Sequence, residues 1–183
     1  IIPSINAPTF EDVQERIVKI EPARLSSRSG RPFVESCHLD VTDGVFSKYE
    51  TWRNPSDLKD LKTKLFVEVH LMVEEPENII NVWLVEPIRR VIVHIEAMKD
   101  PEFIIQKCRA AGREIGFAIK SETPGEALAP WFNKVDIVLV LGVNPGPSGQ
   151  KIGEEIFDKI EALRTACPHC RIELDGGVNR ETI

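Results

Sequence analysis

Apolar segments short enough to be β-strands recur along this chain and alternate with segments that have the apolar spacing of helices. Successive strand candidates mostly begin about 22 to 36 residues apart, the length of a strand–helix unit. Such alternation predicts a parallel sheet covered by helices. The expected strands are 1–6, 33–41, 65–72, 91–96, 114–119, 135–141 and 171–176. The expected helices begin near Thr9, Pro55, Glu75 and Thr123 or span 101–111 and 153–165.

Residues of the types that bind metals stand where three of these strands end. His38 and Asp40 share one face of the second strand, because successive side chains of a strand point to opposite faces. His70 lies near the end of the third strand and Asp175 near the end of the last. A half-exposed strand would also alternate in this way. Recurrence at three strand ends favours a functional site instead.

The positions of these four residues select the fold. An open, doubly wound sheet would separate strands that are far apart in the chain, whereas a barrel brings all carboxyl ends around one mouth. The predicted fold class is therefore α/β, a (β/α)8 TIM barrel, here truncated after strand seven. We expect 1–183 to be a single (β/α) barrel domain that lacks the eighth βα unit. The start without Met and the helix-like turn at 179–183 indicate that residues are missing at both ends.

Composition argues against several classes of function. A net charge of -6, with no basic stripe among aromatic residues, argues against nucleic acid as a partner. No apolar run is long enough to cross a membrane. Four cysteines, at 37, 108, 167 and 170, are too few and too unevenly spaced for a secreted disulfide framework, so we expect a cytoplasmic protein. We interpret Cys167-Pro168-His169-Cys170 as a loop rather than a zinc or redox motif.

Two imidazoles and two carboxylates at one barrel mouth fit a single divalent transition metal, Zn2+, Fe2+, Mn2+ or Co2+, without selecting among them. Such a metal would polarise a substrate oxygen. Asp40 and Asp175, approaching from opposite sides, suit an acid/base pair that removes a proton from one face of a carbon and returns one to the other. We interpret His94 and Glu96, on one face of the fourth strand, as a satisfied polar pair.

A glycine-rich segment, Asn144 to Gln150, follows the sixth strand, and Gly176-Gly177 follows the seventh. Glycines let backbone N–H groups approach an anion, and phosphate sites of such barrels favour the loops after the last strands. These loops therefore predict a phosphate cradle.

Several motifs occur together and in order: Pro3-Ser4-Ile5, His38-Leu39-Asp40-Val41-Thr42-Asp43-Gly44, Val69-His70-Leu71-Met72, Val143-Asn144-Pro145-Gly146 with Gly149-Gln150, and Glu173-Leu174-Asp175-Gly176-Gly177-Val178. In this order and spacing the whole chain resembles the ribulose-phosphate 3-epimerase family. The resemblance implies interconversion of D-ribulose 5-phosphate and D-xylulose 5-phosphate through a metal-stabilised enediolate. It implies that four residues bind the metal, namely His38, Asp40, His70 and Asp175, and that Asp40 and Asp175 also serve as the acid/base pair. It further implies that the substrate contacts Ser4, His70, Met72, Gly146, Gly149, Gly176 and Gly177.

Three loops depart from the family pattern. Where the family usually reads Val-Met-Asp-Gly-His-Phe-Val-Pro-Asn, this chain has different residues at most positions from Thr42 to Tyr49. The usual Leu-Ser after the first strand is Asn6-Ala7, and the usual Gly-Phe-Gly-Gly is Gly146-Pro147-Ser148-Gly149. The metal and acid/base residues are thus complete, while the substrate walls differ.

From these observations we predict a metal-dependent ketose-phosphate 3-epimerase that acts on a small sugar phosphate and forms a homo-oligomer. Within the enzyme class, the alternative is a hexulose 6-phosphate 3-epimerase, which would suit altered walls. The alternative of another class is an inactive, divergent barrel that binds a sugar phosphate or serves as an assembly subunit. Intact Asp40 and Asp175 favour catalysis.

Overall fold

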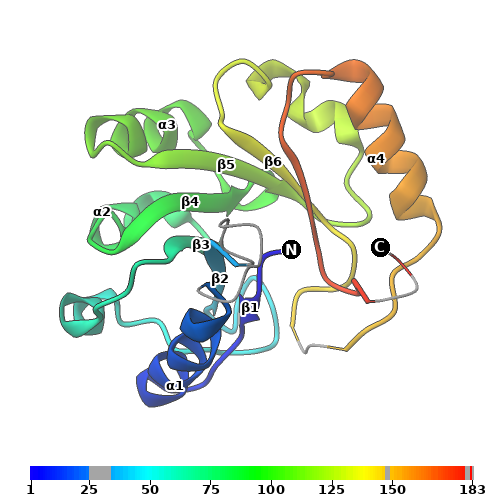
Figure 1. Cartoon of the computed structure of the whole chain (residues 1–183). Coiled ribbons are helices and arrows are strands. Elements are labelled where there is room, and N and C mark those ends of the chain that lie inside the picture. Colours follow the sequence, from blue (N-terminus) through cyan, green and yellow to red (C-terminus); the bar gives the residue numbers. More distant parts are fainter. Residues whose placement is uncertain (25–33, 147–148, 180–181, 183) are drawn as a thin grey trace.

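Seven parallel strands form one sheet in the computed structural model of this chain, which describes residues 1–24, 34–146, 149–179 and 182. The strands lie in chain order, and the sheet curls around its own axis (Figure 1). Their bounds are β1 Ser4–Ile5, β2 Ser36–Thr42, β3 Phe66–Met72, β4 Ile88–His94, β5 Glu114–Ile119, β6 Ile137–Leu141 and β7 Ile172–Asp175. A curled parallel sheet in sequential order is the architecture of a (β/α)8 barrel, so the predicted fold class is confirmed over these seven strands.

Helices connect the strands along the outside of the sheet (Figure 1). The α-helices are α1 Phe10–Ile20, α2 Ile80–Trp83, α3 Pro101–Ala110 and α4 Glu155–Ala166. The 3₁₀ helices are η1 Glu21–Arg24, η2 Pro55–Asp60, η3 Pro76–Asn78, η4 Ile95–Ala97 and η5 Gly125–Trp131. Two predicted helices, near Pro55 and Thr123, are thus 3₁₀ helices. In η5, Pro130 lacks the N–H that an α-helix would need.

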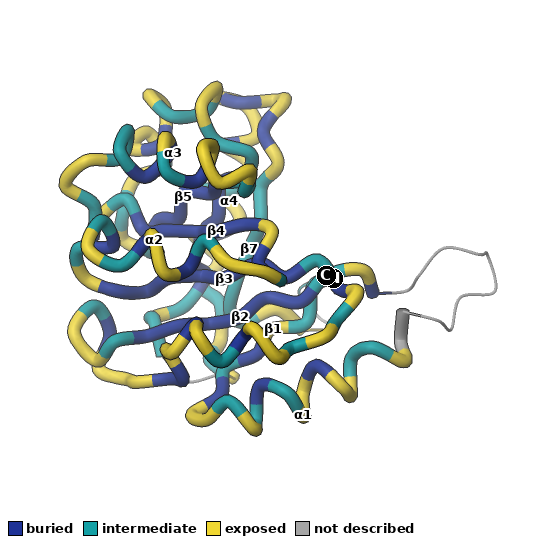
Figure 2. The backbone as a smooth tube through the Cα atoms, turned by 90° about the vertical axis from the view of Figure 1, so that its left-hand side faces the viewer, coloured by how far each residue is buried: buried dark blue, intermediate teal, exposed yellow. Residues whose placement is uncertain are grey.

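The pleat of β2 and β3 separates an apolar outer face from a polar inner face. On β2, Cys37, Leu39 and Val41 belong to the large core between the sheet and its helices. Figure 2 shows strands that are buried along most of their length, whereas the helices alternate between buried and exposed residues. His38 and Asp40, which alternate with these apolar residues, therefore point into the barrel.

The inside of the barrel is divided between apolar and polar side chains. A second, smaller core cluster comes from β4, β5 and β6 and contains Ile92, Ala118, Ile137, Leu139 and Leu141. Gly116 of β5 lies among them, because a Cβ there would meet Ile137 Cγ2 at 2.6 Å and Ile92 Cγ1 at 3.0 Å. Tight apolar packing on this side leaves the polar side chains of β2, β3 and β7 together on the other.

The fourth strand differs from its prediction at both ends. β4 begins at Ile88 and ends at His94, and η4 follows at once. Glu96 is therefore on a 3₁₀ turn rather than on the strand. The predicted turn at 179–183 is only partly described, and Pro147 and Ser148 lie outside the described residues.

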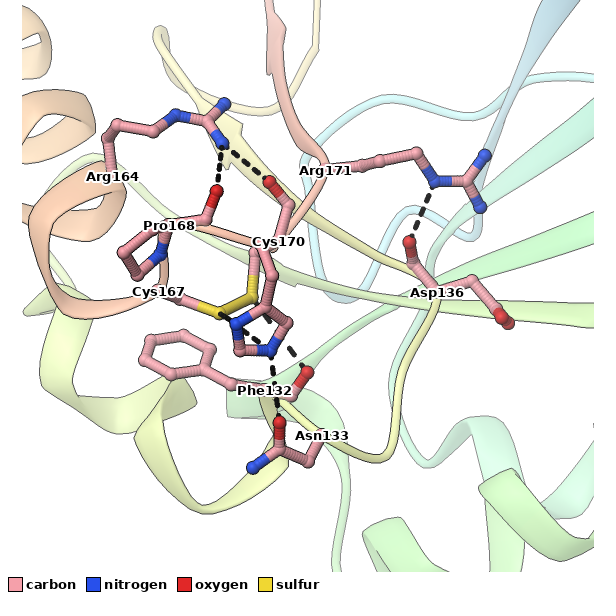
Figure 3. The surroundings of a disulfide bond; sticks show 9 residues. Phe132, Asn133, Asp136, Arg164, Cys167, Pro168, Cys170 and Arg171 are labelled. Atoms are coloured by element: carbon pink, nitrogen blue, oxygen red, sulfur yellow. Dashed lines mark hydrogen bonds between the residues drawn. A yellow bond between two sulfur atoms is a disulfide. The ribbon is translucent and has the colours of Figure 1, made fainter.

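Cys167 and Cys170 form a disulfide in the turn between α4 and β7 (Figure 3). The Arg164 guanidinium donates to the carbonyl of Cys170 at 2.7 Å, and a ring nitrogen of His169 lies 3.0 Å from Asn133 Oδ1. The segment is a turn, as expected, but its disulfide was not predicted. The expectation that the motif has no zinc or redox role stays a prediction, since Cys167, His169 and Cys170 also form a group that could hold a metal ion. Across the described ranges, no helix has the length and apolar character needed to cross a membrane.

Candidate metal and acid/base site

Strand register sets the polar residues of the candidate site beside one another. Asp40 of β2 pairs with His70 of β3, and His38 pairs with Glu68. The curl of the sheet brings the end of β7 back toward β2. As a result, Asp175 Oδ2 lies 3.5 Å from His70 Nδ1 and 4.0 Å from His38 Nε2. The four residues predicted from three separate strands thus meet at one point.

Four side-chain atoms face this point. Asp40 Oδ1 lies 3.4 Å from His38 Nε2 and 3.5 Å from His70 Nδ1, and one ligand atom from each of the four residues lies within 4.8 Å of the others. Three of these atoms, His38 Nε2, Asp40 Oδ1 and His70 Nδ1, are buried and have no hydrogen-bond partner. Buried polar atoms without a partner are rare and cost free energy. A divalent cation would satisfy these atoms together, so the residues fit a metal.

The local charges also favour a cation. Burial alone would lower the pKa of His38, but nearby carboxylates, Asp40 foremost, hold it well above its usual value. Asp175 and Asp40 likewise raise the pKa of His70 against the effect of burial. Burial would raise the pKa of Asp40, and the two imidazoles hold it well below its usual range. Carboxylates that stabilise a positive imidazole would stabilise a bound cation in the same way.

Two carboxylates, the buried Glu68 and the half-buried Glu173, orient His38. His38 Nδ1 lies 2.8 Å from Glu68 Oε1 and 3.2 Å from Glu173 Oε1. Because carboxylates accept, we assign the proton to Nδ1, which leaves the Nε2 lone pair toward the cluster. The second oxygen of Glu68 accepts from Arg90, whose Nε also donates to Glu114 at 2.8 Å. This chain of charges fixes the ring of His38.

His70 is held from behind by another histidine. His70 Nε2 lies 2.9 Å from His94 Nε2, and His94 Nδ1 lies 3.1 Å from Glu96 Oε2. Both rings are fully buried, with centroids 4.9 Å apart and an angle of 21° between their planes. Burial lowers the pKa of His94 to about 4. The polar pair predicted from the sequence is satisfied, and in addition it contacts a candidate ligand.

A cavity of about 570 Å³ opens beside the cluster, a volume suited to a small molecule. Ser4 and Met72, predicted to lie near the substrate, both line it. Ser4 Oγ donates to Asp40 Oδ2 at 2.5 Å. His70 is fully buried and is not among the lining residues, and its contact with substrate stays a prediction. Three of the four cluster residues do line the cavity: His38, Asp40 and Asp175.

The four predicted phosphate-side glycines line the same cavity: Gly146, Gly149, Gly176 and Gly177. All four have a positive φ, which other residues adopt at a cost. At Gly177 a Cβ would also lie 2.8 Å from the backbone nitrogen of Ile152. The loops after β6 and β7 therefore approach each other as closely as only glycine allows.

The three loops that depart from the family pattern contact one another at the mouth. Tyr49, after β2, covers Gly146, after β6, because a Cβ on Gly146 would lie 2.4 Å from the Tyr49 ring. Asn6, after β1, donates through Nδ2 to the carbonyl of Gly146 at 3.1 Å. These altered walls thus form one structural unit.

Sequence reasoning missed Glu68, Glu173 and Arg90. Glu68 and Glu173 stand two residues before His70 and Asp175, so strand alternation could have placed them on the inner face. Arg90 carried no such signal, since its contacts depend on strand register.

Fold and site together define a (β/α)8 barrel with a candidate two-histidine, two-carboxylate cluster at the carboxyl ends of its strands. The profile of the ribulose-phosphate 3 epimerase family matches residues 1–183. This chain therefore belongs to the ribulose-phosphate 3-epimerase family, and the prediction of an epimerase-like isomerase is confirmed at the level of the family.

Curated relatives agree with this assignment. The chain is 33% identical over 161 residues to ribulose-phosphate 3-epimerase of Eremothecium gossypii, covering 81% of this chain and 67% of the relative. It is 34% identical over 186 residues to the cytoplasmic isoform of rice (Oryza sativa), covering 90% and 79%. It is 30% identical over 189 residues to the enzyme of Bacillus subtilis, covering 100% and 82%. The chain thus spans about two thirds to four fifths of these proteins.

Proposed function

We propose that this chain catalyses epimerisation at C3 of a ketose phosphate, with D-ribulose 5-phosphate and D-xylulose 5-phosphate as the pair. The observation that carries the proposal is the convergence of Asp40 and Asp175, from β2 and β7, on one cavity beside two imidazole nitrogens. Epimerisation requires that one group takes a proton from a carbon and another returns a proton to the opposite face. The family and the names of its relatives support the choice of substrate.

His38, Asp40, His70 and Asp175 would hold one divalent transition metal, Zn2+, Fe2+, Mn2+ or Co2+. When bound, the metal would supply Lewis-acid polarisation of the oxygens beside C3. The side chains move the protons: one aspartate takes the C3 proton, the other delivers a proton from the opposite face, and the roles reverse in the reverse reaction. Ser4 steadies Asp40 by donating to its second oxygen at 2.5 Å.

The substrate's phosphate would lie against the loops after β6 and β7. Gly146, Gly149, Gly176 and Gly177 line the cavity and leave its backbone accessible. Glycine loops with positive φ present N–H groups to an anion without a side chain in between. The phosphate would then fix the sugar with C3 toward the two aspartates.

The direct test is solvent exchange at C3. In D2O, wild-type protein should incorporate deuterium at C3 of D-ribulose 5-phosphate, and Asp175→Asn should lose this by about 10²–10⁴-fold. Asp158→Asn, on the exposed side of α4, is the matched control and should exchange normally. Undiminished exchange in Asp175→Asn would contradict the acid/base assignment.

Metal content provides a second test. Wild-type protein should carry one transition metal per chain, and a chelator should remove both metal and exchange activity. A His38→Ala, His70→Ala double variant should not retain metal. Metal content that is unchanged in that variant would reject the site.

A hexulose 6-phosphate is the second candidate substrate, favoured by the altered mouth where Asn6, Tyr49 and Gly146 meet. Comparing kcat/KM for pentulose and hexulose phosphates decides between them. An inactive barrel that only binds a sugar phosphate or assembles with other subunits would exchange neither substrate.

We further propose that 1–183 behaves as one barrel domain, and that the protein is cytoplasmic, as the name of the rice relative indicates for that protein. A homo-oligomer remains a prediction, which light scattering of the purified protein tests directly.

A further inference from the structure

His94 and Glu96 lie behind His70, and neither lines the cavity. His94 Nε2 faces His70 Nε2 at 2.9 Å, and its other ring nitrogen faces Glu96 Oε2 at 3.1 Å. Any role of His94 and Glu96 in the reaction is therefore exerted through His70 and not by contact with substrate.

The partners fix which nitrogens carry protons. A carboxylate only accepts, so His94 Nδ1 carries a proton and donates it to Glu96. A distance of 2.9 Å between the two Nε2 atoms leaves room for a single proton, so one of them donates and the other accepts. We assign this proton to His70, because a His70 proton on Nδ1 instead would be buried without a hydrogen-bond partner. His70 Nδ1 remains as the atom that faces the cluster.

We propose that His94, backed by Glu96, is a positioning residue that keeps the proton of His70 on Nε2 and so reserves the Nδ1 lone pair for the metal. The inference rests on the metal site of the proposed function and not on the choice of substrate. It differs from the arrangement at His38, which presents Nε2 and is held directly by Glu68.

Neighbouring elements hold His94 and Glu96 in place. Glu96 accepts the backbone N–H of Lys120 at 2.8 Å and the hydroxyl of Thr123, so the loop after β5 fixes its carboxylate. Phe46, from the loop after β2, packs on the His94 ring at 4.7 Å, and Lys120 Nζ lies 4.0 Å above the Phe46 ring. A covered His94 leaves its Nε2 to His70 alone, because water cannot compete for it.

Three variants separate hydrogen bonding from packing. His94→Phe keeps a ring between Phe46 and His70 but removes the acceptor. His94→Gln restores an acceptor without the ring, and it carries the test if His94→Phe does not fold. Ile92→Val is the matched control. Ile92 lies beside His70 in the register of β3 and β4 and is fully buried, but its side chain cannot form a hydrogen bond.

The first readout is nitrogen NMR of histidine-labelled protein, metal-free and loaded with Zn2+. The chain has only 4 histidines, so their signals are readily separated. Wild-type protein should show a coupling between the two Nε2 atoms across their hydrogen bond, with His94 in the Nδ1–H form. Absence of this coupling, or His94 in the Nε2–H form, would overturn the proposal.

The second readout is Zn2+ affinity measured by competition with a chelator. Loss of a group that orients a metal ligand typically costs 10–100-fold in affinity, so we expect such a loss for His94→Phe and partial recovery for His94→Gln. Affinity in His94→Phe within twofold of wild type, or an equal loss in Ile92→Val, would refute the role.

Failure of this proposal and failure of the proposed function give different results. Neither readout uses substrate, so the positioning role of His94 can be present in a protein that epimerises no pentulose phosphate. Conversely, deuterium exchange that depends on Asp175, without any coupling between His70 and His94, would support the proposed function and refute the role of His94.

Discussion

Arg90 neutralises a carboxylate in the interior of the barrel, and its removal should destabilise the fold strongly. The Glu68 side chain is 0% exposed and that of Arg90 only 7%, and the two form an ion pair. Arg90→Met would leave Glu68 buried with His38 as its remaining partner. Glu114 would keep Arg171 at 2.9 Å. Breaking one partner of a buried pair costs about 3–5 kcal/mol.

For a chain of this size each kcal/mol lowers Tm by about 2–4 °C, so Arg90→Met should lower Tm by roughly 6–20 °C. Adding Glu68→Gln removes the buried carboxylate that has lost Arg90, while its amide oxygen can still accept from His38, so the double variant should regain most of the loss. Lys19→Met breaks a surface pair with Glu15, 70% and 62% exposed, and should cost no more than about 0.5 kcal/mol.

Urea unfolding of the metal-free proteins, followed by circular dichroism, measures these differences without the stability that a bound metal adds. The reasoning fails if Arg90→Met costs less than about 1 kcal/mol more than Lys19→Met. It also fails if the double variant is less stable than Arg90→Met.

Other changes test other parts of the structure. Reduction of the Cys167–Cys170 disulfide, whose cysteines are 3 residues apart, should lower the free energy of unfolding by about 2 kcal/mol. In a control variant with both cysteines replaced by alanine, reductant should leave Tm unchanged. Burial raises the pKa of Cys108 to about 12, so the unfolded chain loses this proton first and stability should fall as pH rises from about 9 toward 12. Iodoacetamide at pH 8 should label Cys108 only in urea, and labelling of the native protein would contradict this. Gly177→Ala should cost more than the roughly 1–2 kcal/mol of a left-handed alanine, because the added Cβ meets backbone. Gly112→Ala, with nothing within 4 Å, should cost only that amount, and equal urea midpoints for the two variants would refute the close approach.

Local patterns predicted most of the fold. β5, at Glu114–Ile119, matches its prediction, since a short apolar run between turns leaves little freedom. Predictions were weaker where tertiary packing overrides propensity. The segments from Pro55 and Gly125 form 3₁₀ rather than α-helices, and in the second of them Pro130 lacks the backbone N–H that an α-helix would need.

Local patterns also predicted which residues of β2 belong to the candidate site. The alternation of His38 with Leu39 and of Asp40 with Val41 identifies an inner polar face, because a strand has a period of two. The same logic fails for Glu96, since β4 ends at His94 and a 3₁₀ turn brings the carboxylate back to the ring. Local pattern does not encode where a strand stops to that accuracy.

The sequence by itself determined the elements, their order and the residue types able to bind a metal, because periodicity and strand ends are local properties. Only the tertiary structure decided which atoms meet. Register places Asp40 beside His70, and the curl of the sheet brings Asp175 across to both imidazoles. Contacts between residues more than a hundred positions apart depend on the closure of the whole sheet, which no single segment specifies.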